Sequence, residues 1–253
     1  MIPLRDDNPT RTFPLVTIVL IVLNVLVFFY QFSIGLGTSA FQYGLIPAEL
    51  TQQADLVYGG RGTELPPGVG VYNLNPAWFT IFTSMFMHGG LMHILGNMWY
   101  LWIFGNNVED AMGKGRFIAF YLLSGIAAAA LQIVLGPGSH IPMVGASGAI
   151  AGVLGAYLLL FPGSRVLCII PLGFVWFTRE LPAWLVLGFW FVLQLISGLG
   201  ALGMQQTGGV AYAAHVGGFI FGLVFGRLMG RADTGLRPSS RRYTPGQDYM
   251  DWR

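Results

Sequence analysis

Three apolar segments of the sequence carry the polar side chains that could do chemistry. Residues 91–104 contain His93 and Asn97, which are four residues apart and therefore share one face of a helix. The segment 147–161 opens with Ser147, and the segment 211–229 has His215 near its start. Polar side chains are costly inside a membrane span, so each of them calls for a structural or functional reason. These four residues are the candidate functional residues of the chain.

A serine and a histidine in contact would form a nucleophile and its base. A hydroxyl is a weak nucleophile unless a neighbouring group accepts its proton, and His215 could do so for Ser147. The oxyanion that forms on attack needs hydrogen-bond donors. Asn97, His93 and the backbone N–H of Ser147 at a helix N-terminus could provide them. No Asp or Glu lies in the apolar segments, so the pattern predicts a dyad without a carboxylate.

The elements that must position these residues are membrane-spanning helices. Hydrophobic residues make up 54% of the 253-residue chain and charged residues only 9%, whereas a soluble domain carries about a quarter. A span needs about 20 apolar residues. We expect six spans, at residues 14–32, 91–104, 117–135, 147–161, 183–202 and 211–229. The predicted fold class is therefore an all-α membrane protein with a six-helix bundle.

The connections between these spans differ in length. A long loop, residues 33–77, follows the first span and contains the turn signals Gly59-Gly60 and Pro66-Pro67. Residues 166–178 are apolar but too few to span, so we expect an interfacial or re-entrant connection there. The domain limits follow: an N-terminal segment 1–13, a membrane domain 14–230, and a polar tail 231–253 that is expected to be disordered.

The distribution of positive charge predicts the orientation. If the N-terminus is cytoplasmic, six spans place every Lys and Arg except Arg61 on the cytoplasmic side, as the positive-inside rule requires. Both termini are then cytoplasmic, and the long first loop lies outside. The second, fourth and sixth spans all run inward, so the four candidate residues share one depth in the outer half of the membrane.

Small residues could let the fourth and sixth spans approach closely. Glycine recurs on one face of each segment: Gly148, Gly152 and Gly155 in one, and Gly218, Gly222 and Gly226 in the other. Stripes of small residues allow helix backbones to come together in lipid. Such an approach is needed if the serine and the histidine are to touch.

The motifs in this order resemble those of the rhomboid intramembrane proteases. The matching elements are His93-Ile94-Leu95-Gly96-Asn97, Gly145-Ala146-Ser147-Gly148 and Ala214-His215, with Gly105…Glu109, the long first loop and the glycine stripe of the sixth span. The resemblance covers residues 14–230. It implies that Ser147 is the nucleophile, that His215 is the general base and acid, and that His93, Asn97 and the Ser147 amide bind the oxyanion.

The resemblance also implies a reaction and its partners. Family members hydrolyse a peptide bond in or near a transmembrane helix of another protein, which would enter sideways from the lipid. They use no metal and no cofactor. We therefore expect membrane-protein substrates and lipid as partners and, since the net charge is only +2, no nucleic acid. The absence of long appended domains favours a bacterial inner membrane, with an organelle membrane as the alternative, and the active site is expected toward the outer face.

Two positions depart from patterns found in some family members. Where those members have Trp-Arg in the first loop, Trp78 is followed here by Phe79. Where they have a tyrosine one turn after the serine, packed on the histidine, this chain has Ala151. A different residue, from the second or fifth span, must then hold the imidazole of His215.

Other functions are compatible with the same residues. A serine at a helix start is more often a cap or a packing residue, and an asparagine in a span more often links helices. A binding protein on this scaffold would be expected to have lost the dyad. A transporter could use His93, Asn97 and His215 as a proton relay, although no carboxylate lies in the expected spans. We expect His88 to be structural, His140 to be solvated, and Glu109 and Asp110 to be structural hydrogen-bonding groups in the inner loop after the second span.

Overall fold

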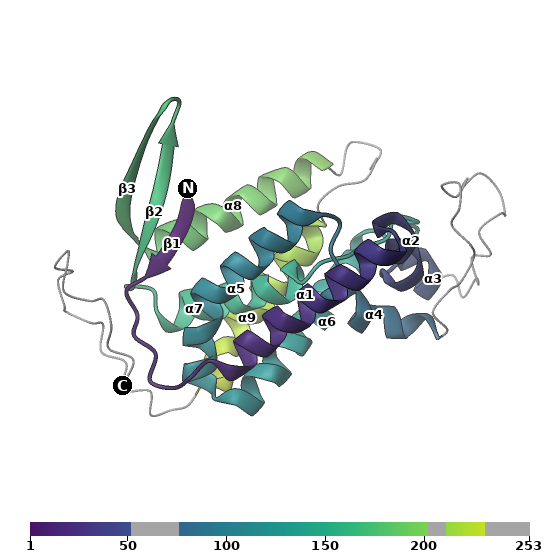
Figure 1. Cartoon of the computed structure of the whole chain (residues 1–253), viewed down its shortest axis with the longest axis horizontal. Coiled ribbons are helices and arrows are strands. Elements are labelled where there is room, and N and C mark those ends of the chain that lie inside the picture. The colour runs from purple at the N-terminus through teal and green to yellow at the C-terminus, as the bar shows by residue number, and fades with distance from the viewer. Residues whose placement is uncertain (52–75, 202–210, 231–253) are drawn as a thin grey trace.

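Long helices packed into one bundle dominate the computed structural model, which describes residues 1–51, 76–201 and 211–230 (Figure 1). Each of the six apolar segments forms a helix. In chain order these helices are α1 (Leu15–Ile34), α5 (Leu91–Met112), α6 (Lys114–Leu135), α7 (Ser147–Leu160), α8 (Ala183–Ala201) and α9 (Tyr212–Met229). The mostly helical architecture is therefore as the sequence predicts.

Four of the described helices are long and apolar enough to cross a membrane. They are α1, α6, residues Ala183–Gly200 of α8, and α9. Helix α7 has only 14 residues, and the apolar character of α5 is diluted by its polar side chains. The outer surfaces of the bundle are strongly apolar: Phe32 of α1 and Leu228 of α9, for example, are exposed. This is the surface of a membrane protein, while the number of six spans stays a prediction.

Helices α7 and α9 are in backbone contact through their glycines. A Cβ atom at Gly218 would overlap the carbonyl oxygen of Gly148, and one at Gly222 would overlap that of Gly152. Only glycine therefore fits at these two positions of α9. The predicted close approach of the two helices is confirmed, and it is what brings the start of α7 next to the start of α9.

The C-terminal end of α5 is hydrogen-bonded to the start of α1. The sequence placed Glu109 in a loop, but α5 continues past it to Met112. The buried Glu109 carboxylate accepts hydrogen bonds from the backbone N–H groups of Val16 and Thr17, at 3.0 and 2.8 Å, and from the Thr17 hydroxyl. These N–H groups belong to the first turn of α1, where a carboxylate is favourable because the helix dipole is positive there. Glu109 thus has the structural role expected of it.

The expectation of a purely helical protein is wrong at one place. Three strands, β1 (Ile2–Asp6), β2 (Arg165–Leu172) and β3 (Val175–Pro182), form an antiparallel sheet in the order β1-β2-β3. The predicted interfacial connection between α7 and α8 is thus a β-hairpin. Its residues are rich in β-branched and aromatic side chains, which favour strands. Gly173, at φ 59°, opens the two-residue turn, where a positive φ is required.

Short helices between α1 and α5 pack on one end of the bundle. They are α2 (Leu36–Tyr43), α3 (Pro47–Thr51), the 3₁₀ turns η1 (Ala77–Phe79) and η2 (Ser84–Phe86), and α4 (Thr80–Thr83). In place of the Trp-Arg pair, exposed Trp78 and Phe79 rings pack edge to face, with Phe82 beside them. The turn signals at residues 59–67 and the predicted tail, 231–253, lie outside the described residues.

Candidate active site

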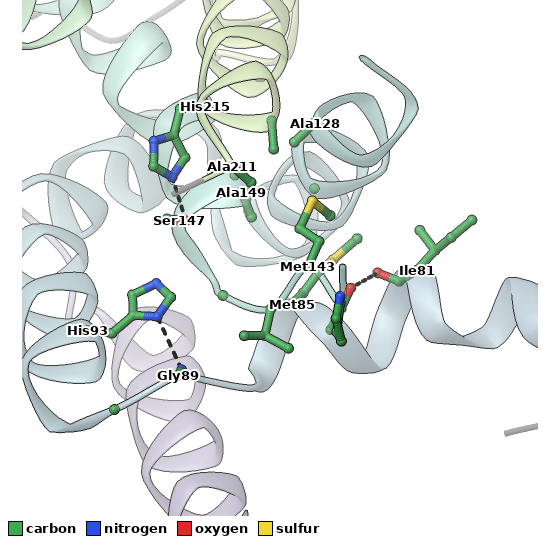
Figure 2. A pocket seen from close by; sticks show the side chains of 18 of the residues that line it. Ile81, Met85, Gly89, His93, Ala128, Met143, Ser147, Ala149, Ala211 and His215 are labelled. Atoms are coloured by element: carbon green, nitrogen blue, oxygen red, sulfur yellow. Dashed lines mark hydrogen bonds between the residues drawn. The ribbon is translucent and has the colours of Figure 1, made fainter. Parts of the chain in front are cut away.

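The structure brings Ser147 and His215 into hydrogen-bond contact. Ser147 is the first residue of α7, and His215 lies in the first turn of α9. The Ser147 Oγ and the His215 Nε2 are 2.7 Å apart, and Figure 2 shows both side chains facing the same space. This distance is typical of a strong hydrogen bond. The hydroxyl can therefore give its proton directly to the imidazole, as a nucleophile does to its base.

Gln194 of α8 holds the other side of the imidazole. Its Oε1 lies 2.8 Å from the His215 Nδ1. An amide oxygen can only accept a hydrogen bond, so Nδ1 carries the proton and Nε2 keeps the lone pair that Ser147 needs. The Trp190 ring packs on the imidazole with centroids 5.9 Å apart. Two residues of the fifth predicted span, Gln194 and Trp190, thus hold the imidazole in this chain, which has Ala151 at the tyrosine position.

Sequence reasoning did not identify Gln194, although it required a residue of the second or fifth span. The usable signal is its amide, the most polar side chain in an otherwise apolar helix. Its contact with His215 depends on the rotation of α8 about its axis, which the hydropathy pattern of a nearly uniformly apolar helix does not define.

His93 approaches Ser147 from α5. Its Nδ1 accepts a hydrogen bond of 3.2 Å from the Gly89 N–H (Figure 2), so its Nε2 carries the proton and can donate. A Cβ atom at Gly145 would lie 2.9 Å from His93 Nε2 and 3.3 Å from Ser147 Oγ. The absent side chain of Gly145, at φ 138°, therefore leaves open the space between the histidine and the serine.

Asn97 is placed differently from the other three predicted residues. It is buried on α5, one turn after His93, and its Nδ2 has no hydrogen-bond partner within the described residues. It does not belong to the residues found to line the cavity at Ser147. An unpaired buried amide donor is costly, but the structure does not bring Asn97 into the cavity with His93, Ser147 and His215.

A cavity of about 810 Å³ opens beside the dyad. Its polar lining comes from Ser84, His93, Ser147 and His215, and most of its remaining wall is apolar or glycine. The wall beside Ser147 is built from the small residues Gly145, Gly148, Ala149, Ala211 and Ala214. Such a lining suits an extended apolar segment.

His88 has a structural position behind this cavity. Its backbone N–H donates to Gln31 Oε1 at 2.8 Å, and its carbonyl accepts from Gln31 Nε2 at 3.2 Å. Its ring packs edge to face on His93, with centroids 5.2 Å apart. His140 is exposed. Within the described ranges, no three His, Cys, Asp or Glu side chains gather as a metal site would require.

Fold and site together define a polytopic membrane protein with a Ser–His pair in a cavity of its helical bundle. A family model described as "Rhomboid domain" matches residues 75–232, which include all four predicted site residues. The chain belongs to the rhomboid family.

Curated relatives agree with this assignment. The chain is similar to "Rhomboid protease GluP" of Bacillus subtilis (strain 168), with 34% identity over 141 residues, covering 55% of this chain and 26% of that protein. It is 30% identical over 158 residues to "Rhomboid protein 1, mitochondrial" of Saccharomyces cerevisiae, covering 60% and 42%. It is 32% identical over 149 residues to the human "Presenilin-associated rhomboid-like protein, mitochondrial", covering 55% and 35%. The matched region is thus less than half of each relative.

Proposed function

We propose that this protein is an intramembrane serine endopeptidase that cuts membrane proteins in or near a transmembrane helix. The observation that carries the proposal is the 2.7 Å contact between Ser147 Oγ and His215 Nε2. A serine that merely capped or packed a helix would not need a histidine from another helix with its second nitrogen held by an amide acceptor.

The first half of the reaction forms an acyl-enzyme. Ser147 Oγ attacks the scissile carbonyl carbon while its proton passes to His215 Nε2. The carbonyl oxygen becomes an oxyanion, for which His93 Nε2–H, the Ser147 N–H and the Asn97 amide are donors. When the C–N bond breaks, His215 gives the proton to the leaving amine.

The second half of the reaction frees the enzyme. Water attacks the acyl carbon and gives its proton to His215, and Ser147 leaves with that proton. Gln194 accepts a hydrogen bond from Nδ1–H throughout, which fixes the tautomer and stabilises the imidazolium that forms in both halves. Gln194 is therefore a positioning residue in this mechanism, since it acts through His215.

Substrates reach this site from the lipid. The start of α7 lies in the outer half of the membrane if the N-terminus is cytoplasmic, as the positive charges favour. The apolar wall of the cavity suits a segment leaving the hydrocarbon, and the family resemblance implies a small side chain before the cut. A helix must unwind locally before its peptide bond meets Ser147. We assign the protein to a bacterial inner membrane, with both termini cytoplasmic.

The test uses the full chain in liposomes with a model transmembrane substrate. Ser147→Ala and His215→Ala should each abolish cleavage, while Ser33→Ala and His140→Ala, which change exposed residues away from the cavity, should cleave at the wild-type rate. A fluorophosphonate should label the wild type and not Ser147→Ala. Full cleavage by Ser147→Ala would overturn the proposed mechanism.

The same experiment separates the alternatives. A binding protein on this scaffold would hold substrate without cleaving it and without reacting with the probe. A transporter would give solute or proton flux that depends on His215 and survives Ser147→Ala. The Gln194 contact favours the protease, because it leaves His215 ready to accept the proton of a neighbouring hydroxyl.

A further inference from the structure

The tip of the β2–β3 hairpin is an exposed apolar surface far from the active site. Residues 172–177, which we call the hairpin tip, read Leu-Gly-Phe-Val-Trp-Phe and carry no charge. Phe174 is fully exposed and Trp176 is 64% exposed. Figure 1 shows the hairpin projecting away from the helices beside α8, with its tip free of the bundle. Exposure of such an apolar surface to water is unfavourable, so the surface is expected to contact an apolar partner.

The base of the hairpin, in contrast, is held firmly. Val166 and Cys168 are buried, and β1 pairs with β2 from Val166 to Ile169. The Asp7 carboxylate accepts a hydrogen bond of 2.8 Å from the Arg165 N–H. The position of the tip is therefore set by a fixed base.

Both ends of the hairpin are joined to helices at the same end of the bundle. The hairpin follows the end of α7 at Leu160 and leads directly into α8 at Ala183. The first exposed residues of α8, Trp184 and Leu185, continue the apolar surface. This face of α8 meets lipid if α8 spans the membrane.

The charged residues of the hairpin lie only at its base. Arg165, Arg179 and Glu180 lie at the base, and the apolar residues lie at the tip. Trp and Phe near positive residues are typical of segments at a membrane–water interface. We propose that the hairpin tip inserts into the cytoplasmic leaflet of the bilayer that surrounds α8, with the charged base among the headgroups.

The open strand edges limit the depth of this insertion. Beyond Ile169, within the described residues, β2 has no partner other than β3, and β3 is an edge strand throughout. Unpaired backbone groups are not tolerated in the hydrocarbon core but are hydrated at the interface. The residue pairs from Leu172–Val175 to Ile170–Phe177 extend over roughly 7 Å at about 3.4 Å per residue, which fits an insertion of about 5–10 Å.

A second copy of the chain is a less suitable partner for the hairpin tip than lipid. Stable protein interfaces use about 20–30 residues on each side, and the tip has six. Its surface is also a narrow projection, whereas self-association requires a face that matches its own copy. Lipid has no such requirement of shape.

Spin-label accessibility in phosphatidylcholine–phosphatidylglycerol vesicles tests the proposal. The sequence has a single cysteine, Cys168, so a Cys168→Ala background allows one label at a time. A label at Phe174→Cys should collide readily with oxygen and rarely with a water-soluble nickel complex. Leu193→Cys, on the exposed face of α8, is the lipid control, and Gly163→Cys, in the exposed turn after α7, is the water control.

The outcomes are distinct. Nickel accessibility at Phe174→Cys equal to that at Gly163→Cys would overturn the proposal. So would low accessibility to both reagents with spin–spin broadening that disappears on dilution with unlabelled protein, because that result identifies a second copy. Thr178→Cys, nearer the charged base, should be more accessible to nickel than the tip, and Trp176→Cys repeats the test if Phe174→Cys does not fold. The result is independent of the proposed protease activity.

Discussion

Replacing Gln194 by leucine should slow catalysis without weakening substrate binding. Leucine is of similar size but cannot accept the hydrogen bond that His215 Nδ1–H donates at 2.8 Å. A hydrogen bond is worth about 0.5–1.5 kcal/mol to a neutral group and about 1.5–3 kcal/mol to a charged one, and only the increase on forming the imidazolium raises the barrier. That increase is about 1–1.5 kcal/mol, and since about 1.4 kcal/mol is a factor of ten in rate, kcat should fall about 5- to 12-fold while KM changes little.

The measurement is single-turnover cleavage of a transmembrane substrate in liposomes, with the fluorophosphonate reaction rate as a second readout. Gln194→Glu retains an acceptor and should be faster than Gln194→Leu, with an altered pH–rate profile, whereas a purely structural role would predict no such rescue. Leu193→Ala changes the neighbouring exposed residue of α8 and is the matched control. A wild-type kcat for Gln194→Leu, or a loss confined to KM, would refute the reasoning.

Two further predictions concern packing and pH. Gly222→Val should strongly lower the thermal stability in detergent, because its Cβ would overlap the Gly152 carbonyl and overpacking costs at least about 1–3 kcal/mol. The control is Gly96→Val, which has open space at its Cβ and should lose only the difference in helix propensity. Equal losses of stability in the two variants would contradict this account. Burial raises the pKa of Asp6 from its usual 3.8 to about 7, against the lowering effect of its hydrogen bond from Tyr157. The folded state therefore holds a proton that the unfolded chain releases, and this contribution to stability is present at low pH and lost as the pH rises through about 7. Thermal melts from pH 5 to 8 should show that loss in the wild type and a flatter profile in Asp6→Asn; parallel profiles would exclude Asp6 as the titrating group.

The sequence predicted the helices well because long apolar runs have few alternatives in a membrane protein. It also predicted that Ser147 and His215 meet, because the shared depth of these two residues and the glycine stripes of their segments can both be read from the linear sequence. It placed the end of the second helix too early, at 104, because it assigned Glu109 to a loop. Glu109 is in fact buried in α5 as the cap of α1.

The hairpin and the Gln194 contact could not be predicted in the same way. An apolar run of about a dozen residues fits a re-entrant segment, an interfacial helix or two strands, and hydropathy does not choose between them. Strand β1 pairs with β2 across more than 150 residues of sequence, so its existence depends on the tertiary fold. The Gln194 contact requires one particular rotation of α8, which a nearly uniformly apolar helix does not encode in its periodicity.

The glycine contact between α7 and α9 also determines which part of the catalytic apparatus can be adjusted. Sliding one helix along the other by a single residue would displace its side chains by about 1.5 Å, enough to break the 2.7 Å contact of the dyad, and the interlocked backbones oppose any such movement. Helix α8 has less of its surface packed in the bundle: 17% of the residues in its apolar stretch are buried, against 33% in α9. Nucleophile and base are thus built into a rigid pair, while the acceptor behind the base is carried by a helix with less surface buried in the bundle, so that a change in the tilt of α8 would alter the base without separating the pair.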